Sequence, residues 1–308
     1  MPIKMERLNM AVKCLGYLAL QVKDKKEIEK LACTIMGMQK VAGPSVGAEN
    51  DYYRIDQRAH RLIVMPGEED KLYCAGWQVA DSAALEEVRD KLSARDMKWE
   101  ELSEKDCAVR GVDEGLAFLD PAANRHDVCV GELEADDPFQ SPVGVSRFIT
   151  GDMGMGHVVL PAPAFEETFE FLREVLGFEL SDELPVPMGA GGPVLRVRFM
   201  HCANPRHHSL AIFEGQHPAG CVHWMLEVPD LDTVGLAMDR AEQQGMPLFA
   251  TLGRHTNDNM LSVYFMSPGG IGVEYGCDGL QMDWKDWKPT ILESGDLWGH
   301  QYAMMKDL

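Results

Sequence analysis

The stretch Met-Gly-His-Val-Val-Leu at residues 155–160 places a histidine at the start of a short apolar run, which is the pattern of a buried strand. Two later stretches have the same form. Cys-Val-His-Trp-Met-Leu-Glu-Val at 221–228 contains His223, and Val-Glu-Tyr-Gly at 273–276 contains Glu274. Each expected strand therefore carries one possible metal ligand. Two imidazoles and one carboxylate can bind one face of an ion and leave the opposite positions open, which is typical of a non-haem Fe(II) site.

The two halves of the chain resemble each other. Gly-Tyr at 16–17, Cys-Ala-Gly-Trp at 74–77 and Cys-Val-Gly at 129–131 correspond in order to Gly-His at 156–157, Cys-Val-His-Trp at 221–224 and Glu-Tyr-Gly at 274–276. A repeat over this distance, in a chain of 308 residues, predicts an α+β fold with two similar domains, each a strand, a helix and further strands. We expect the domains at 1–140 and 141–308, joined through the acidic, proline-containing stretch 132–145.

Periodicity and capping residues indicate the main elements. The apolar run 10–22 superficially resembles a signal peptide, but Lys13 interrupts it and no small-residue cleavage site follows. It is therefore expected to be the first core strand. Residues 185–193 and 254–259 are expected to be loops, and the first of these could line a binding pocket. Helices are predicted over 25–36, 83–92, 165–176 and 233–244, with Asp81 and either Asp230 or Asp232 as N-caps and with Gly177 and Gly245 as terminators.

Comparison of the two halves indicates which of them contains the possible metal ligands. The second half has His157, His223 and Glu274 where the first half has Tyr17, Gly76 and Cys129. A single buried histidine is usually an ordinary core residue, but three possible ligands on three expected strands, all absent from the sister repeat, are harder to explain by packing. A buried glutamate would also be costly without a cation or another partner. We therefore expect a metal centre in the second half and a structural role for the first.

Other polar residues surround these strands in the sequence. His207 and His208 enter a strand, so one is expected to point inward and the other outward. His255 lies in a polar run, and Tyr264 lies within the strand that follows. A solvated loop for His207 and His208, and ordinary core packing for Tyr264, are the alternative interpretations.

Five motifs together resemble the type I extradiol ring-cleavage dioxygenases of the vicinal oxygen chelate superfamily, most closely the 2,3-dihydroxybiphenyl 1,2-dioxygenase branch. The motifs are Gly-His-Val-Val-Leu at 156–160, Arg-His-His-Ser-Leu-Ala-Ile at 206–212, His-Trp-Met-Leu-Glu-Val at 223–228, Leu-Gly-Arg-His-Thr-Asn-Asp-Asn at 252–259 and Val-Glu-Tyr-Gly at 273–276. The likeness extends to Leu-Gly-Tyr at 15–17 and Trp-Gly-His at 298–300. It implies tandem βαβββ modules that form two barrel-like domains, and cleavage of a bulky catechol with O2 as co-substrate.

The resemblance also implies roles for individual residues. It implies that His157, His223 and Glu274 bind Fe(II), that His208 acts as acid and base, that His255 and Tyr264 hydrogen-bond the bound catecholate, and that Asn257, Asp258 and Phe199 lie at the pocket. Mn(II) accepts similar ligands. Relatives are commonly homo-oligomers, often octamers. Three features depart from the family pattern: Val222 replaces a second histidine, the loop before His207 is one residue longer, and Gly295 stands near a pocket proline.

Composition excludes several other classes. The formal net charge of −20 repels a phosphate backbone, so nucleic acid is not an expected partner. No apolar run approaches the length of a membrane span. The eight cysteines form no C-x-x-C pair and indicate free thiols in a reducing cytoplasm.

The same superfamily offers alternatives. A glyoxalase-like isomerase or a thiol transferase would use a metal, typically with four ligands, and a drug-binding protein of this fold would need none. The 4-hydroxyphenylpyruvate dioxygenases share the ligand types, but the His-Thr-Asn-Asp motif at 255–258 fits the catechol enzymes better.

Overall fold

The computed structural model describes residues 11–189 and 191–303. The first half forms an eight-stranded sheet in the order β2-β3-β4-β1-β5-β8-β7-β6. Its strands are β1 Val12–Val22, β2 Gln39–Val41, β3 Asp51–Arg54, β4 Leu62–Pro66, β5 Lys71–Val79, β6 Trp99–Glu101, β7 Glu114–Leu119 and β8 Arg125–Val130. Its helical segments are α1 Lys25–Glu29, the π-helical η1 Lys30–Met36, α2 Ser82–Ser93 and α3 Glu104–Arg110.

The second half forms a ten-stranded sheet in the order β17-β10-β11-β12-β9-β13-β16-β15-β14-β18. Its strands are β9 His157–Pro161, β10 Glu179–Pro187, β11 Val194–His201, β12 Leu210–Phe213, β13 His223–Glu227, β14 Leu248–His255, β15 Leu261–Met266, β16 Gly272–Cys277, β17 Thr290–Ile291 and β18 Asp296–Trp298. Its helical segments are η2 Gly151–Met153, α4 Phe165–Phe171, the π-helical η3 Leu172–Leu176, α5 Leu231–Gln243 and η4 Pro268–Gly270.

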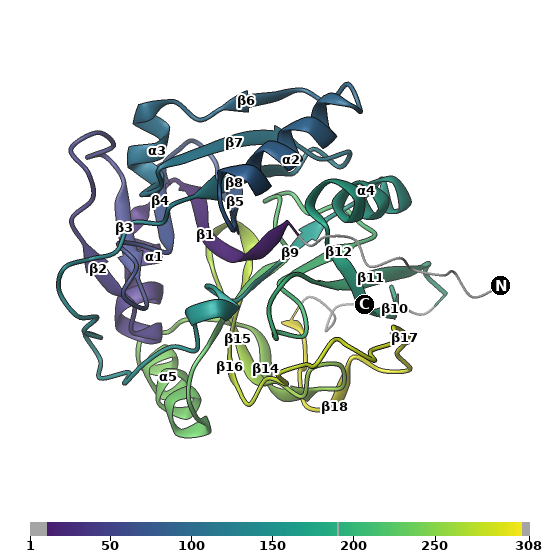
Figure 1. The fold of residues 1–308 in the computed structure, drawn as a ribbon. Helices are drawn as coiled ribbons and strands as arrows, with labels where there is room; N and C mark the ends of the chain where they lie inside the picture. Colours follow the sequence, from purple (N-terminus) through teal and green to yellow (C-terminus); the bar gives the residue numbers. More distant parts are fainter. Residues whose placement is uncertain (1–10, 190, 304–308) are drawn as a thin grey trace.

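The two sheets repeat one topology. Without the short outer strands β17 and β18, the second sheet has the strand order of the first, with β10-β11-β12-β9 in place of β2-β3-β4-β1. The registers also agree, because Leu18 lies opposite Leu62 and Val158 lies opposite Leu210 in the equivalent parallel pairs. The predicted α+β class and the internal repeat are confirmed. Figure 1 shows the two sheets side by side, the first in purple and blue and the second in teal to yellow.

Local sequence explains the helix ends. The carboxylate of Asp81 accepts a hydrogen bond from the backbone N–H of Ala84, and that of Asp230 accepts one from Thr233 at 2.8 Å. Asp230 is therefore the N-cap of α5, and the alternative Asp232 lies inside the helix. Gly177 ends η3 in the left-handed conformation, as predicted, with a φ of 76°.

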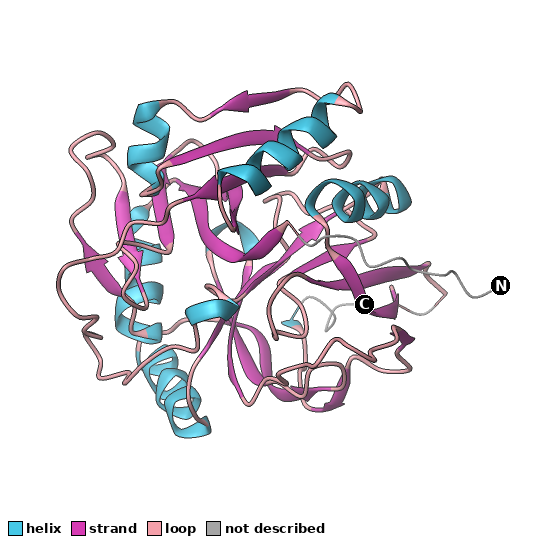
Figure 2. Cartoon of the chain, in the orientation of Figure 1, coloured by secondary structure: helices cyan, strands magenta, loops and turns pink. Residues whose placement is uncertain are grey.

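The two halves share a core, because one cluster of buried side chains includes residues of both sheets. Figure 2 shows strands of the two halves meeting near the centre of the molecule. The ring of Trp77 meets that of Phe178 edge to face at 5.0 Å between centroids. The hydroxyl of Tyr275 donates to the backbone carbonyl of Met36 at 2.9 Å, and Arg240 donates to that of Ile35 at 2.9 Å. Each half therefore buries apolar surface against the other, which supports the strands that carry the site.

Some expectations need correction. Residues 185–187 continue β10, and Arg254 and His255 belong to β14, so the two expected loops are shorter. The strands β2, β6, β10, β14, β17 and β18 and the helix α3 were not predicted. The expected first strand is confirmed as β1, although Met10 lies outside the described residues. Within the described ranges, no helix is both long and apolar enough to cross a membrane.

Candidate metal centre

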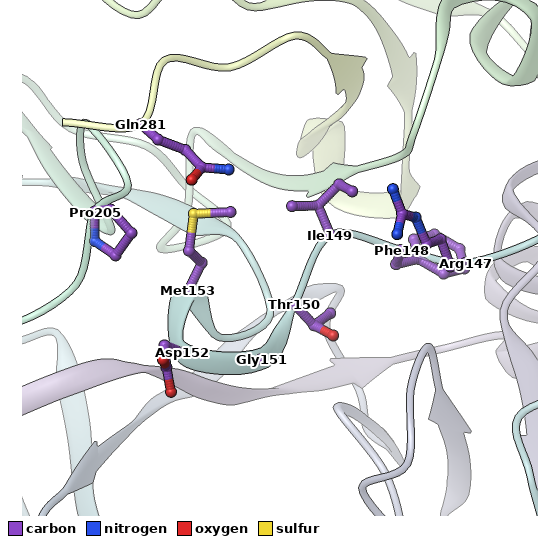
Figure 3. A pocket seen from close by; sticks show the side chains of 9 residues that line it. All are labelled: Arg147, Phe148, Ile149, Thr150, Gly151, Asp152, Met153, Pro205 and Gln281. Atoms are coloured by element: carbon purple, nitrogen blue, oxygen red, sulfur yellow. The ribbon is translucent and has the colours of Figure 1, made fainter.

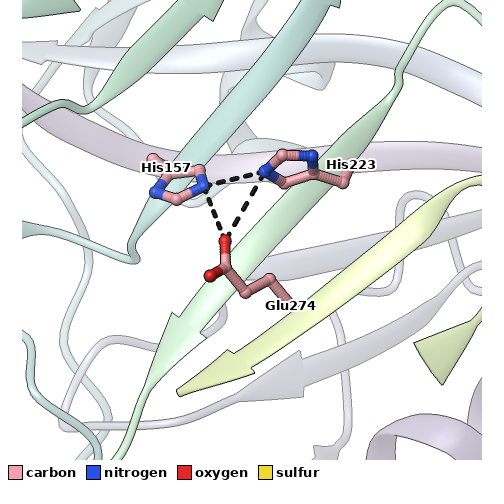
Figure 4. A group of neighbouring side chains, drawn as sticks. All are labelled: His157, His223 and Glu274. Atoms are coloured by element: carbon pink, nitrogen blue, oxygen red, sulfur yellow. Dashed lines mark hydrogen bonds and ion pairs between the residues drawn. The ribbon is translucent and has the colours of Figure 1, made fainter. Parts of the chain in front are cut away.

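His157, His223 and Glu274 converge on one point. They lie on β9, β13 and β16, which are consecutive neighbours in the second sheet. Nε2 of His157 lies 3.1 Å from Nε2 of His223 and 3.1 Å from Oε2 of Glu274, and the remaining distance, from His223 to Glu274, is 3.5 Å. Figure 4 shows the three side chains pointing toward one another from separate strands. The strands predicted from the apolar runs therefore bring together the three predicted ligands.

The donor spacing fits one metal ion. Ligand atoms bound at right angles about 2.1 Å from an ion lie about 3 Å apart, close to the observed distances. Glu274 is only 1% exposed, and its Oε2 makes no hydrogen bond of good geometry with any described residue. A buried carboxylate oxygen in this situation favours a bound cation. The three side chains therefore fit a divalent metal.

The electrostatics favour the ligating forms. Burial lowers the pKa of His223 to about 3, so the imidazole is neutral and keeps a lone pair. Burial alone would raise the pKa of Glu274, but His157 and His255 outweigh it and hold the pKa well below its usual value. Neutral imidazoles and an ionised carboxylate are the forms that bind metals.

His207 and His208 are both buried, so the alternative of a solvated loop is wrong. The ring of His208 lies 4.1 Å from that of His157 between centroids, beside the centre. His207 points the other way, with Nε2 3.0 Å from Oδ2 of Asp182. Burial, reinforced by His157, lowers the pKa of His208 well below its usual value. The two rings point in different directions, but the expectation that one of them faces outward is wrong, because both are buried.

The other predicted pocket residues lie near His208. The ring of Phe199 is 4.9 Å from that of His208 between centroids. Oδ2 of Asp258 lies 3.8 Å from Nδ1 of His208. Asn257 is buried at 8% exposure in the same turn as Asp258. The structure therefore places Phe199 and Asp258 against the ring of His208, and Asn257 next to Asp258 in the chain.

His255 and Tyr264 lie on the Glu274 side of the centre. Nε2 of His255 is 2.7 Å from the Tyr264 hydroxyl and 3.2 Å from Oε1 of Glu274. Burial alone would lower the pKa of His255, but the carboxylates of Asp296 and Glu274 raise it well above its usual value. The carbonyl of Gly295, a position that departs from the family pattern, lies 3.3 Å from Nδ1 of His255. Tyr264 is thus more than a core residue, because its hydroxyl faces polar partners.

Three residues near the centre were missed from the sequence. The hydroxyl of Ser262 donates to Oε1 of Glu274 at 2.6 Å. Oδ1 of Asp296 lies 2.8 Å from Nδ1 of His255 and 2.6 Å from Nδ1 of His300. Strand alternation could have indicated Ser262, which is two residues before Tyr264 and so on the same face. Asp296 and His300 lie in the segment that follows the repeat. His300 belongs to the Trp-Gly-His motif at 298–300, for which the sequence indicated no role.

A hollow lies apart from the predicted site residues. It has a volume of about 490 Å³, and Figure 3 shows the residues that line it, which are Arg147, Phe148, Ile149, Thr150, Gly151, Asp152, Met153, Pro205 and Gln281. None of the described residues predicted for the site lines this hollow.

The equivalent place in the first sheet is filled by protein. The hydroxyl of Tyr17 donates to Oδ2 of Asp127 at 3.0 Å, and Nε of Arg110 donates to the same oxygen at 2.5 Å. Cys129, the counterpart of Glu274, lies 3.6 Å from the Tyr17 hydroxyl. A guanidinium thus supplies the positive charge here, and the first sheet has no equivalent of the three-ligand group among its described residues.

Comparison with known proteins agrees with this geometry. Residues 154–275 match the Glyoxalase/Bleomycin resistance protein/Dioxygenase superfamily, and residues 15–67 match the first domain of the dihydroxybiphenyl dioxygenase BphC. The chain is 38% identical over 300 residues to an iron-dependent extradiol dioxygenase of Rhodococcus jostii, covering 96% of this chain and 99% of that protein. It is 37% identical over 293 residues to a biphenyl-2,3-diol 1,2-dioxygenase of Paraburkholderia xenovorans, covering 95% and 96%.

A solved structure gives the same result. The crystal structure of BphC, a halotolerant catechol dioxygenase, superposes with a TM-score of 0.88 at 33% identity and covers 97% of each chain. The chain therefore belongs to the extradiol dioxygenases of the glyoxalase/bleomycin resistance/dioxygenase superfamily.

Proposed function

We propose that the protein cleaves the ring of a bulky catechol next to its two hydroxyls, with Fe(II) bound by His157, His223 and Glu274. The observation that carries this proposal is the convergence of three donor atoms 3.1 to 3.5 Å apart, one of which is a buried carboxylate oxygen without a hydrogen bond. Mn(II) would accept the same ligands. A glyoxalase-like isomerase is less consistent with the site, because only three described residues group around this centre.

The relatives support a substituted catechol as substrate. They include biphenyl-2,3-diol 1,2-dioxygenases, a 3-methylcatechol 2,3-dioxygenase and a 1,2-dihydroxynaphthalene dioxygenase. All of these names describe a vicinal diol on a substituted or fused ring. We therefore choose 2,3-dihydroxybiphenyl as the test substrate, with Phe199 as a wall of the pocket.

The bound ion would supply Lewis acidity toward the catechol hydroxyls and hold the catechol beside O2. Nε2 of His255 and the Tyr264 hydroxyl, 2.7 Å apart, would bind and orient the catechol oxygens. His208, whose ring lies against His157, would accept a hydroxyl proton and later return it to the product. Asp258 and Asn257 would complete the polar wall near His208. Both atoms of O2 enter the ring-opened acid.

The activity can be tested by colour. The ferrous protein is mixed without air with 2,3-dihydroxybiphenyl, air is admitted, and a yellow ring-opened product is expected. Glu274→Gln is the control and should give none. His208→Phe should keep the bound metal and slow turnover. A wild-type protein that binds Fe(II) but gives no yellow product would contradict the proposed reaction, and undiminished turnover in His208→Phe would contradict the role of that histidine.

The repeated strand order supports a division into domains at 1–140 and 141–308, with the chemistry in the second. All eight cysteines are free thiols within the described residues, which supports a reducing, cytoplasmic setting. A homo-oligomer is supported by exposed apolar side chains on the outer strands β17 and β18, where Ile291 is 71% and Leu297 is 59% exposed. Light scattering would measure the assembly.

A further inference from the structure

Asp182, on β10, is surrounded by hydrogen-bond donors. Its Oδ1 accepts from the backbone N–H of Thr290 at 2.9 Å and from the Thr290 hydroxyl at 2.7 Å. Its Oδ2 lies 3.0 Å from Nε2 of His207, and Asp182 itself is only 2% exposed. A buried carboxylate can only accept hydrogen bonds, so Nε2 of His207 carries a hydrogen and donates it.

This hydrogen bond determines whether Nδ1 of His207 carries a hydrogen. A neutral imidazole that donates from Nε2 has a lone pair on Nδ1. Nδ1 of His207 lies 3.2 Å from Nδ1 of His208. His208 therefore has to donate from its own Nδ1. The carboxylate of Asp258, 3.8 Å from the same nitrogen, favours a hydrogen at that position too.

The position of the hydrogen on His208 matters for the chemistry at the metal centre. With the hydrogen of the neutral ring on Nδ1, Nε2 of His208 has a free lone pair. A lone pair on that nitrogen is what a general base needs in order to take a proton from a catechol hydroxyl.

We propose that Asp182 and His207 are positioning residues that set the tautomer of His208 through a buried relay, which Thr290 of the C-terminal segment anchors. The inference rests on the proposed acid and base role of His208. Neither Asp182 nor His207 touches the substrate in this scheme.

The change Asp182→Asn tests the relay directly. Both groups of Thr290 can donate to the new amide oxygen, so the amide N–H₂ must face Nε2 of His207. That nitrogen then has to accept, His207 donates from Nδ1, and His208 accepts at Nδ1 and carries its hydrogen on Nε2. An Asp→Asn change that inverts the tautomer of a catalytic histidine can lower kcat about 10⁴-fold. We expect a loss of about 10²- to 10⁴-fold in kcat, with KM for the catechol changed less than about threefold.

The tautomer can also be observed without turnover. In metal-free protein with ¹⁵N-labelled histidine, the imidazole signals absent from His208→Phe identify His208. The wild type should show hydrogen on Nδ1, and Asp182→Asn should show it on Nε2. Affinity for Mn(II), measured by calorimetry, should change less than about threefold in Asp182→Asn, because the three ligands are untouched.

Glu183→Gln is a matched control. It removes the same charge one position along β10, where Glu183 pairs with Arg198 at 2.8 Å. It should leave kcat and the His208 tautomer unchanged. In a His208→Phe background, Asp182→Asn should cause no further loss, because it acts through His208.

Two results would overturn the relay: a hydrogen on Nε2 of His208 in the wild type, or an unchanged tautomer in Asp182→Asn. Losses that add fully in the double variant would overturn it as well. If the wild type shows the expected tautomer but cleaves no catechol, the proposed function fails and the relay stands.

Discussion

The hydroxyl of Ser262 donates to Oε1 of Glu274 at 2.6 Å, while Oε2 of the same carboxylate faces His157 and His223 without a hydrogen bond. The two oxygens therefore have different surroundings. One is held by the protein, and the other is free to bind a cation. A hydrogen bond of this kind orients a ligand for its metal.

Ser262→Ala should therefore weaken metal binding. Loss of such an outer partner typically costs about 10- to 100-fold in affinity, and we expect a loss in that range for Mn(II) or Fe(II). Calorimetric titration of the metal-free protein measures the dissociation constant.

Ser267→Ala is the control for this change. Ser267 is also buried at the end of a strand of the same sheet, and its hydroxyl makes no hydrogen bond with the described residues. It should keep the wild-type metal affinity. Equal affinities for Ser262→Ala and Ser267→Ala would show that the serine does not hold Glu274.

The first sheet gives a stability prediction. Asp127→Asn would remove a buried charge and leave Arg110, whose side chain is 5% exposed, without its closest anion. Breaking a buried ion pair in this way costs about 3–5 kcal/mol. We expect a decrease of that size in the free energy of unfolding by urea.

An exposed pair supplies the comparison. Glu86→Gln breaks the contact of Glu86 with Arg89 on the surface of α2 and should cost no more than about 1 kcal/mol. Metal affinity should be unchanged in both variants, because the centre lies in the other sheet. A loss below about 1 kcal/mol in Asp127→Asn would mean that Arg110 finds other partners.

The three proposed metal ligands could be found from the sequence, because each lies in a short apolar run and the sister repeat lacks all three. Their convergence follows from strand order, since β9, β13 and β16 are neighbours. The repeat also predicted the fold class, because two weak patterns with the same spacing reinforce each other.

The outer partners could not be found in this way. Asp182 and Thr290 are 108 residues apart and meet only because β17 pairs with β10. No periodic pattern in the sequence indicates that these two strands pair. His255 was expected in a loop because polar residues follow it, yet β14 is held between β15 and β18. Tertiary pairing overrides local polarity there.

Metal binding should stabilise the fold. An ion that binds only the folded state adds about 2.7 kcal/mol to the free energy of unfolding at a free concentration 100 times its dissociation constant. Anaerobic addition of Fe(II) should therefore raise Tm for the wild type. Glu274→Gln should show no increase, because it loses the ligand oxygen that carries charge. An equal rise in both proteins would place the ion elsewhere.

His60 should make stability depend on pH in the first half of the chain. Burial lowers its pKa from 6.5 to about 4, because the neighbouring backbone hydrogen bonds only partly offset the cost and the cation of Arg61 adds to it. In the unfolded chain His60 therefore binds a proton below about pH 6.5, whereas in the folded chain it binds one only below about pH 4. Stability from this group is present above pH 6.5 and is lost as the pH falls toward 4.

The substitution His60→Gln tests this. It should flatten the profile of unfolding free energy between pH 6.5 and 4, relative to wild type, as measured by urea titration at each pH. His217→Gln, at a histidine with a smaller lowering of pKa, serves as the comparison and should flatten it less. Parallel wild-type and His60→Gln profiles between pH 6.5 and 4 would rule out a neutral buried His60.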